Sequence, residues 1–199
     1  MNIFATDESP FQAALALPDK HIIKMPLESA QMLAVAFGQH GLNLGQLRKM
    51  DGGYYADTAF RNHPCTVWAR SNFANLAWLI VHAQSLAYEY LHRYGKFHGA
   101  AIAIGDASNL FAQTGFGLGC YGDHTPFARA MPEYLKHDQD IDTITAYRRY
   151  LVNHKPWAKW DRDPSRKPGW WSAAEDNAVA ERQRLAHHLE MTEGAGALL

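Results

Sequence analysis

The chain has 199 residues, of which 47% are hydrophobic and 20% are charged, and its formal net charge is −1. This composition excludes extensive disorder and excludes nucleic-acid binding through overall basicity, while the length suffices for one domain with a buried core. Two cysteines and the lack of an apolar run of about 20 residues exclude a disulfide framework and a membrane span, so we expect a protein of the reducing cytoplasm.

The first half of the sequence contains helical patterns separated by loops. In chain order, the expected elements are an extended opening at 2–5, helices at 9–17, 19–37 and 71–94, and a glycine-containing loop at 38–62. The helix at 71–94 has the clearest pattern, because its apolar residues repeat every three or four positions. Pro26 removes one backbone hydrogen bond inside the helix at 19–37, so a kink is expected there, and the alternative is that the helix restarts at Pro26.

The second half adds further helices but no convincing strand. In chain order, the expected elements are a helix near 98–112, a glycine-rich loop at 115–123, helices at 142–153 and 172–190, and a frayed tail at 191–199. The helix at 172–190 is expected to begin with a capping box at Ser172. These elements predict a mainly α fold: a single compact cluster of five or six helices with a short extended N-terminal segment, forming one domain over residues 1–199.

The helix at 19–37 carries a polar face. His21, Lys24 and Glu28 share this face at 100° per residue, and Asp19 precedes them at the helix start. Carboxylate, imidazole and amine groups transfer protons and contact anions, so these four residues are the candidate catalytic residues. The alternative is an ordinary solvated helix face.

Four further clusters combine cations, histidines and aromatic rings, which are the residue types that neutralise a nucleic-acid backbone and stack on its bases. The candidate nucleic-acid-binding residues are Asn62, His63, Arg93, Lys96, His98, Arg148, Lys155, Trp157, Trp160 and Trp170. Some have structural alternatives, because Asn62 or His63 would cap a helix. Likewise, Arg93 and Lys96 would complement the dipole at a helix end. Neither paired Cys-x-x-Cys motifs nor His-Glu-x-x-His occurs, so no metal site and no cofactor are predicted.

Over most of the chain, these motifs resemble those of a group of small tailed-phage proteins. The shared patterns are Asp-Lys-His-x-x-Lys-Met-x-x-Glu, Asn-His-Pro-Cys-x-x-Trp, Arg-Tyr-Gly-Lys-x-His, Ala-Tyr-Arg and a Lys-Trp…Pro-x-Trp ending, here at 19–28, 62–68, 93–98, 146–148, 159–160 and 168–170. The resemblance implies a phage-type protein that works in the cytoplasm of the host cell.

The chain also resembles the phage pyrimidine-dimer DNA glycosylases of the endonuclease V type, which are compact helical proteins that excise damaged bases. The residues Asn2-Ile3, Asp19-Lys20-His21 and Glu28 reproduce the order and spacing of that family's N-terminal region. The ending at 168–170 is similar to that family's Pro-x-Trp segment. The resemblance implies that Glu28 is the catalytic carboxylate and that DNA is the partner.

The sequence departs from that family at the nucleophile. The family attacks the sugar with the α-amine of a small residue that removal of the initiator methionine exposes, whereas Asn2 is too large for routine removal of Met1. Lys24 or Lys20 would supply an amine if burial lowered its pKa.

The leading hypothesis is an enzyme that acts on a base in DNA by N-glycosylase-like chemistry. Glu28 would stabilise an oxocarbenium-like sugar or activate water, and His21 would orient it or pass protons. One alternative is a base-hypermodification transferase that acts on a modified thymine, and another is a non-catalytic nucleic-acid-binding protein. Convergence of these two residues with His63 and Arg148 on one pocket would favour an enzyme, whereas scattering over the surface would favour the binding protein.

Overall fold

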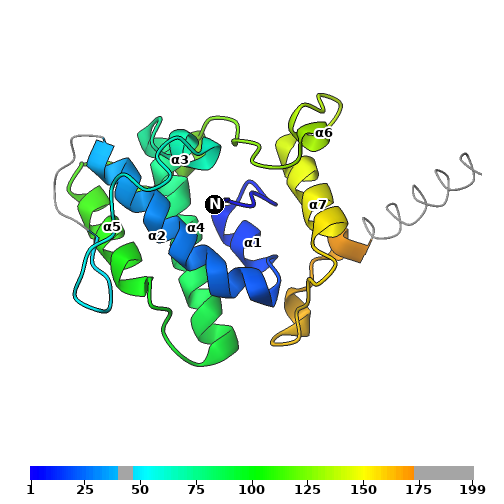
Figure 1. Ribbon diagram of the computed structural model, residues 1–199, viewed down its shortest axis with the longest axis horizontal. Helices are drawn as coiled ribbons and strands as arrows, with labels where there is room; N and C mark the ends of the chain where they lie inside the picture. Colours follow the sequence, from blue (N-terminus) through cyan, green and yellow to red (C-terminus); the bar gives the residue numbers. More distant parts are fainter. Residues whose placement is uncertain (40–46, 173–199) are drawn as a thin grey trace, which may run out of the picture.

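The computed structural model describes residues 1–39 and 47–172, and this part of the chain is mainly α-helical (Figure 1). Its helices are α1 (Pro10–Leu15), α2 (Asp19–Gln39), α3 (Pro64–Ala69), α4 (Phe73–Tyr94), α5 (Ala101–Ala112), α6 (Glu133–Lys136) and α7 (Thr143–His154), with two 3-10 helices, η1 (Leu118–Asp123) and η2 (Pro164–Arg166). Within these ranges, β-type pairing is limited to an isolated bridge between Arg48 and Tyr54. The predicted mainly α fold is therefore confirmed. None of these helices is long and apolar enough to cross a membrane.

The central helix of the fold is α4. Trp78, Leu79 and Ile80 follow one another in the sequence and all three are fully buried, so α4 is covered on several sides. It packs against α1, α2, α5 and η1. At its start the side chain of Asn72 accepts a hydrogen bond from the N–H of Asn75 at 2.8 Å, which is the pattern of a helix N-cap.

Gly95 ends α4 in the left-handed region, with a φ of 66°, and its N–H donates to the carbonyl of Leu91 at 2.8 Å. No atom would contact an added methyl group, so Gly95→Ala is expected to lower the free energy of unfolding by the conformational cost alone, about 1–2 kcal/mol. Gly105 is the matched control because it lies in open space inside α5, where Gly105→Ala is expected to stabilise by about 0.4–1 kcal/mol. Urea unfolding measures both changes, and effects of the same sign would contradict this explanation.

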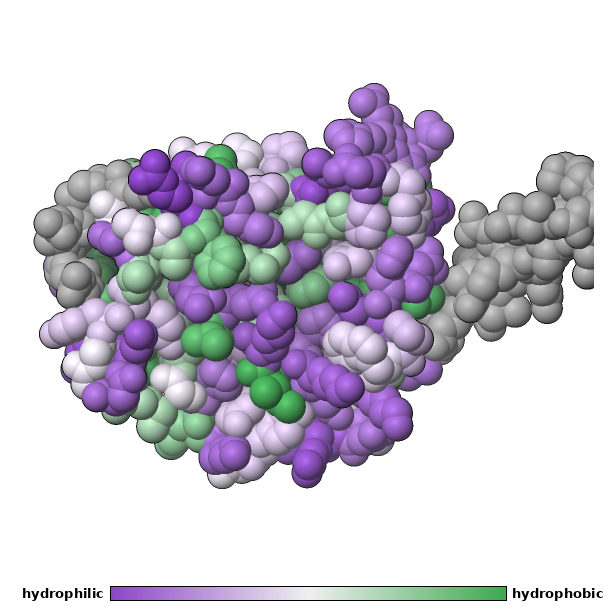
Figure 2. All heavy atoms as spheres, viewed as in Figure 1, coloured by the Kyte–Doolittle hydropathy of each residue, from purple (hydrophilic) through white to green (hydrophobic). Residues whose placement is uncertain are grey.

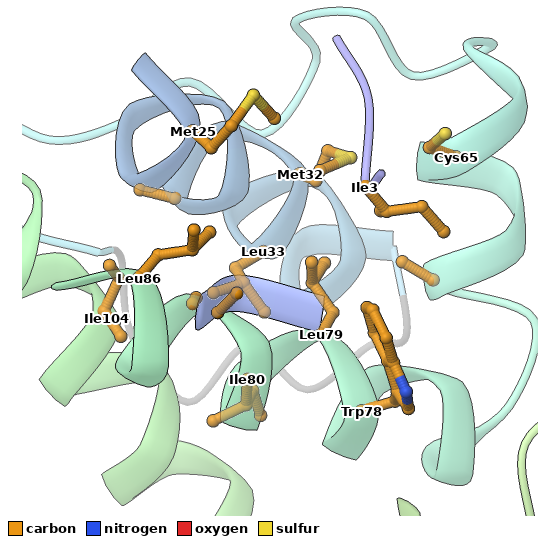
Figure 3. Close-up of a cluster of buried hydrophobic side chains, with 14 of the residues drawn as sticks. Ile3, Met25, Met32, Leu33, Cys65, Trp78, Leu79, Ile80, Leu86 and Ile104 are labelled. Atoms are coloured by element: carbon orange, nitrogen blue, oxygen red, sulfur yellow. The ribbon is translucent and has the colours of Figure 1, made fainter. Parts of the chain in front are cut away.

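The hydrophobic core lies between α2 and α4 and is completed by the N-terminal segment (Figure 3). Met32 and Leu33 of α2 lie opposite Leu79 of α4 in this view, while Ile3 enters beside α3. Ile3 is 1% exposed, so burial of its side chain holds the first residues of the chain against the core. The N-terminus is thereby kept next to α2, which carries the candidate catalytic residues.

After α7, the chain comes back to the start of α2 through residues 155–166, which we call the return segment. The N–H of Asp19 donates to the carbonyl of Lys159 at 2.8 Å, and the Asp19 carboxylate accepts from the N–H of Arg162 at 3.0 Å. The buried indole of Trp160 donates to the C-cap carbonyl of α1 at 3.3 Å. These bonds fasten the return segment to both α1 and α2.

A buried ionic network lies beneath the return segment. The guanidinium of Arg93, whose side chain is 0% exposed, contacts Glu89 and Asp19, each at 3.1 Å. It also donates to the backbone carbonyls of Leu15, the last residue of α1, and Leu17, each at 2.9 Å. Arg166 reaches the other oxygen of Glu89 at 3.0 Å, so the network joins α2, α4 and η2. Because each buried charge has partners, the network tolerates burial that would otherwise be costly.

The structure differs from the sequence-based expectations in three local details. The stretch 115–123, predicted as a plain loop, contains η1, and the short α6 was not predicted. Both are too short to show a hydrophobic period. Residues 169–172 are already helical, so helical structure begins before the predicted capping box, and residues 173–190 of the predicted helix lie outside the described residues. The helix predicted at 19–37 is confirmed as one helix that contains Pro26, which excludes a restart there.

Candidate active site

A cavity of about 340 Å³ lies where the N-terminal segment, α2, α7 and the return segment meet. It is lined by Met1, Asn2, Phe4, Lys20, His21, Lys24, Met25, Glu28, Tyr150, Lys155 and Trp157. In Figure 1, the N-terminus accordingly lies between α2 and α7. Three of the four candidate catalytic residues line this cavity, together with two of the candidate nucleic-acid-binding residues.

The carboxylate of Glu28 lies between two amines. One oxygen is 3.6 Å from the α-amine of Met1, and the other is 3.0 Å from Nζ of Lys24. The side chain of Met1 is 2% exposed, but the residue as a whole is half-buried, so its accessible surface lies on its backbone atoms; the side chain of Lys24 is 70% exposed. Glu28 itself is buried, which strengthens its electrostatic attraction to the two amines.

The side chain of Asn2 fixes the start of the chain. Its amide nitrogen donates to the carbonyl of Ala130 at 2.7 Å, and its oxygen accepts from the N–H groups of Ile3 and Phe4 at 2.8 and 3.0 Å. Phe4 has a φ of 41°, a left-handed conformation that is strained for a bulky residue and that surrounding contacts must maintain. The position of the α-amine beside Glu28 is therefore held by both the core and these hydrogen bonds.

His21 is enclosed by aromatic rings. Phe4 meets it edge-on at 4.5 Å between ring centroids, and Trp157 stacks on it at 5.2 Å with an interplanar angle of 25°. Burial, with smaller contributions from Lys155 and Lys24, lowers the pKa of His21 to about 3, so the imidazole is neutral at physiological pH. Its buried Nδ1 has no hydrogen-bond partner among the described residues, which leaves one ring nitrogen for a bound ligand or water.

The stability of the protein is expected to fall in mild acid because of two buried histidines. Burial lowers the pKa of His21 to about 3 and that of His82 to about 4, against an ordinary value of 6.5. The unfolded chain therefore binds protons below pH 6.5 that the folded chain does not bind. The free energy of unfolding should have its full value above pH 6.5. It should fall by about 1.4 kcal/mol per pH unit for each histidine as the pH drops towards 4.

Urea unfolding at pH 7, 6 and 5 measures this slope. His21→Gln and His82→Gln should each reduce the slope of the free energy of unfolding against pH by the contribution of one proton, whatever their effect on the stability at pH 7. A slope that neither substitution changes would contradict the assignment to these two residues.

Amines and aromatic rings make up most of the cavity wall. Nζ of Lys20 lies 5.0 Å from the ring centre of Trp157, and Nζ of Lys155 lies 5.0 Å from that of Tyr150. Glu28 is the one carboxylate among the lining residues, and the described residues contain no group of three potential metal ligands. A cavity lined by amines and aromatic rings is suited to an anionic ligand that carries a flat ring.

Figure 2 shows that the surface in this view is largely hydrophilic, with hydrophobic side chains in separate patches.

Three residues predicted to act on the ligand lie instead in the interior. Asp19 is bonded to Arg93 and to the return segment, and the guanidinium of Arg93 is enclosed by the network described above. Trp160 is 6% exposed and packs edge-on against Trp171 at 4.9 Å. These side chains hold the return segment in place and do not reach the cavity.

Two of the candidate histidines bond to the backbone. Nδ1 of His63 accepts from the N–H of Cys65 at 3.2 Å, so His63 caps α3, which is the structural alternative considered from the sequence. Nδ1 of His98 accepts from the N–H of Ala100 at 3.0 Å, while its other nitrogen is 3.0 Å from the carbonyl of Ile23. Burial lowers the pKa of both, and the α-amine of Met1 lowers that of His63 further, which places His63 near the cavity.

The remaining candidates lie away from the cavity. Arg148 donates to the carbonyl of Thr6 at 2.9 Å and lies over the ring of Trp170 at 5.3 Å. Asn62 and Lys96 are exposed on other surfaces of the described chain. The four residues whose convergence would favour an enzyme therefore come together only in part. His21 and Glu28 line the cavity, His63 lies near it, and Arg148 lies away from it.

Sequence reasoning missed three contributors to the site: the α-amine of Met1, the ring of Phe4 and the ring of Tyr150. Phe4 and Tyr150 stack at 5.9 Å with an interplanar angle of 13°. Tyr150 belongs to one of the aromatic and basic clusters noted in the sequence, so that cluster was the available signal. For the α-amine, the signal was the resemblance to a family that uses an N-terminal amine.

The model of the pyrimidine dimer DNA glycosylase family matches residues 1–102, which is 102 of the 199 residues. No curated protein and no solved structure gave a match. The matched region contains Glu28 and the helices α1 to α4, whereas Tyr150, Lys155 and Trp157 come from outside it. Since the match covers half of the chain, the protein belongs to the pyrimidine dimer DNA glycosylase family.

Proposed function

We propose that the protein releases a damaged pyrimidine from DNA by cleaving its N-glycosidic bond, with Glu28 as the catalytic carboxylate. The observation that supports this most directly is the buried carboxylate of Glu28 beside the α-amine of Met1, at 3.6 Å, inside a cavity with aromatic walls. A carboxylate and an amine in contact are the two groups that nucleophilic displacement at a sugar carbon requires. The family match supports the same class of reaction.

In this proposal the α-amine of Met1 is the nucleophile. Glu28 takes a proton from the amine, whose nitrogen then bonds to C1′ of the deoxyribose. The N-glycosidic bond breaks, its electron pair leaves with the base, and the base takes up a proton from water. The C1′–O4′ bond then opens: the attached nitrogen releases a second proton to water, O4′ takes up the proton held by Glu28, and a protonated imine joins the sugar to the protein. The carboxylate of Glu28, ionised again, stabilises the positive charge of this imine.

Lys24 is the competing amine, since its Nζ lies 3.0 Å from Glu28. Its 70% exposed side chain is well hydrated, whereas the α-amine of Met1 is held in place by Asn2 and the core. His21 has a different task in this proposal. A neutral imidazole with a pKa of about 3 does not donate a proton as an imidazolium at neutral pH, so His21 orients a ligand or water through its free Nδ1.

Chemistry at C1′ requires the target nucleotide to leave the base stack. Phe4, Tyr150 and Trp157 offer rings on which an extruded pyrimidine stacks, and Lys155 lies between Tyr150 and Trp157, at 5.0 and 6.0 Å from their ring centres. Base stacking on such rings contributes about 1–3 kcal/mol per base.

Borohydride trapping tests the proposal. The purified protein is incubated with a duplex that carries a cyclobutane pyrimidine dimer, with and without sodium cyanoborohydride, and peptides are mapped by mass spectrometry. Base release with a sugar adduct on the N-terminal residue is the expected result. An adduct on Lys24 would move the nucleophile there, and base release without an adduct would favour water activated by Glu28.

Two other outcomes would overturn the proposal. A mass change without base loss in DNA that contains 5-hydroxymethyluracil would indicate a base-modifying transferase. Intact DNA binding with no reaction on either substrate would indicate a binding protein.

A further inference from the structure

A second cavity of about 400 Å³ adjoins the candidate active site on the return segment. Trp157 and Lys20 line both cavities, so the two share a wall. The second cavity is also lined by Tyr94, Lys159 and Arg162. It therefore begins where the proposed catalytic pocket ends.

The second cavity contains more cations than carboxylates that could neutralise them. Lys20, Lys159 and Arg162 are exposed, and none of the three forms an ion pair within the described ranges of the chain. Two carboxylates line the same cavity, but that of Asp19 is bonded to Arg93 and to a backbone N–H. Asp161 is thus the one acidic side chain to offset three cations, and the cavity has a net attraction for anions.

Aromatic rings in this cavity lie beside its cations. The guanidinium carbon of Arg162 is 5.2 Å from the ring centre of Tyr94, and Nζ of Lys20 is 5.0 Å from that of Trp157. The hydroxyl of Tyr94 donates to the carbonyl of Asp19 at 3.2 Å, which fixes the ring. A phosphate with a sugar or base attached fits this pairing of cation and ring, because cations neutralise the backbone while rings receive the flat group.

The walls of the cavity are fixed before any ligand binds. Asp19 holds the return segment through the N–H of Arg162 and through its own N–H to Lys159. Asp19 is therefore a positioning residue, which explains its place in the sequence motif without a role at the reacting atoms. Pre-positioned groups lose less conformational entropy when a ligand binds.

We propose that this second cavity binds the nucleotide next to the target, with its phosphate held by Lys20, Lys159 and Arg162. The proposal rests on the proposed function, since the neighbouring cavity takes the target nucleotide. The neighbour is the nucleotide on the side of the target that carries no dimer bond, and Trp157, which lines both cavities, lies between the two nucleotides. The DNA strand thus runs from Glu28 across Trp157 towards Tyr94.

Binding to an unreactive probe tests this inference separately from catalysis. The probe is a fluorescein-labelled duplex with a tetrahydrofuran abasic analogue at the target position, measured by anisotropy over a range of salt concentrations. Arg162→Ala and Lys159→Ala should each weaken binding and reduce the slope of log affinity against log salt by about 1. The control Lys136→Ala, at an exposed cation on α6, should leave that slope unchanged.

Neutral methylphosphonate linkages then identify the phosphate. One such linkage next to the analogue should weaken binding of the wild type, and it should weaken binding of Arg162→Ala by a smaller factor, because only Lys20 and Lys159 still contact that phosphate. Unchanged slopes in both variants, or no adjacent linkage whose effect depends on Arg162, would overturn the inference. If the slopes change as expected but no pyrimidine-dimer DNA loses a base, the second cavity stands and the proposed reaction fails.

Discussion

Glu28→Gln is expected to slow base release from pyrimidine-dimer DNA by about 10²–10⁴-fold, which is the usual contribution of a positioned acid or base. The amide has nearly the shape of the carboxylate but neither accepts a proton from the α-amine nor stabilises positive charge on the sugar. Glu28 lies 3.6 Å from that amine in a buried setting, so water does not replace it easily. Single-turnover release of the base, with binding to the abasic analogue as a parallel measurement, separates the chemical step from affinity.

Two control variants accompany this measurement. Glu133→Gln removes an exposed carboxylate on α6 and should leave the rate unchanged. Lys24→Ala removes the exposed partner of Glu28 and should slow the reaction less than Glu28→Gln does, because Met1 supplies the nucleophile in our proposal. A Glu28→Gln protein that retains the wild-type rate within a few-fold would make this carboxylate structural.

Arg93→Met is expected to lower the free energy of unfolding by about 3–5 kcal/mol, the cost of removing one partner from a buried ionic network. Glu89, at 0% side-chain exposure, would keep only Arg166 as a charged partner, and Asp19 would lose its contact with the guanidinium. Urea unfolding at pH 7 measures the change. The control is Arg48→Met, because Arg48 is 62% exposed and its pair with Asp106 should contribute at most about 1 kcal/mol.

The same variant separates two explanations of Arg93. In the structure its guanidinium is enclosed, so the folded fraction of Arg93→Met should bind the abasic analogue with little loss of affinity at salt concentrations that preserve the fold. If Arg93 contacted a phosphate, the variant would instead lose affinity and reduce the salt slope by about 1 while retaining its stability.

Local sequence patterns predicted most of the helices but only part of the site. The apolar period of α4 lies within that helix, and the seven-residue spacing from His21 to Glu28 lies within α2. Both patterns predicted helices, and both helices are present. The short elements η1 and α6 have no such period. The shared helical face placed His21 and Glu28 on one cavity because a helix is rigid over two turns.

Roles that depend on distant partners were not readable from local sequence. Arg93 and Asp19 lie 74 residues apart in the chain and form an ion pair, so two motifs that resembled ligand contacts bind each other. Trp160 belongs to an aromatic and basic cluster, but it is buried against α1 while Trp157, three residues earlier, lines the cavity. Residue type suggested the same role for both tryptophans, and only tertiary packing distinguishes them.

The candidate site joins the first residues of the chain to residues 150–157, and this has a consequence for the order of folding. Contacts between such distant segments form slowly, because a long loop must close before they gain any stability. Helices α2 and α4 gather their hydrogen bonds locally and should appear early after dilution from denaturant. The cavity beside Glu28 is complete only after the return segment has docked on α1 and α2. During refolding, excision activity should therefore recover after the helical circular dichroism signal, with a delay set by the docking of the return segment.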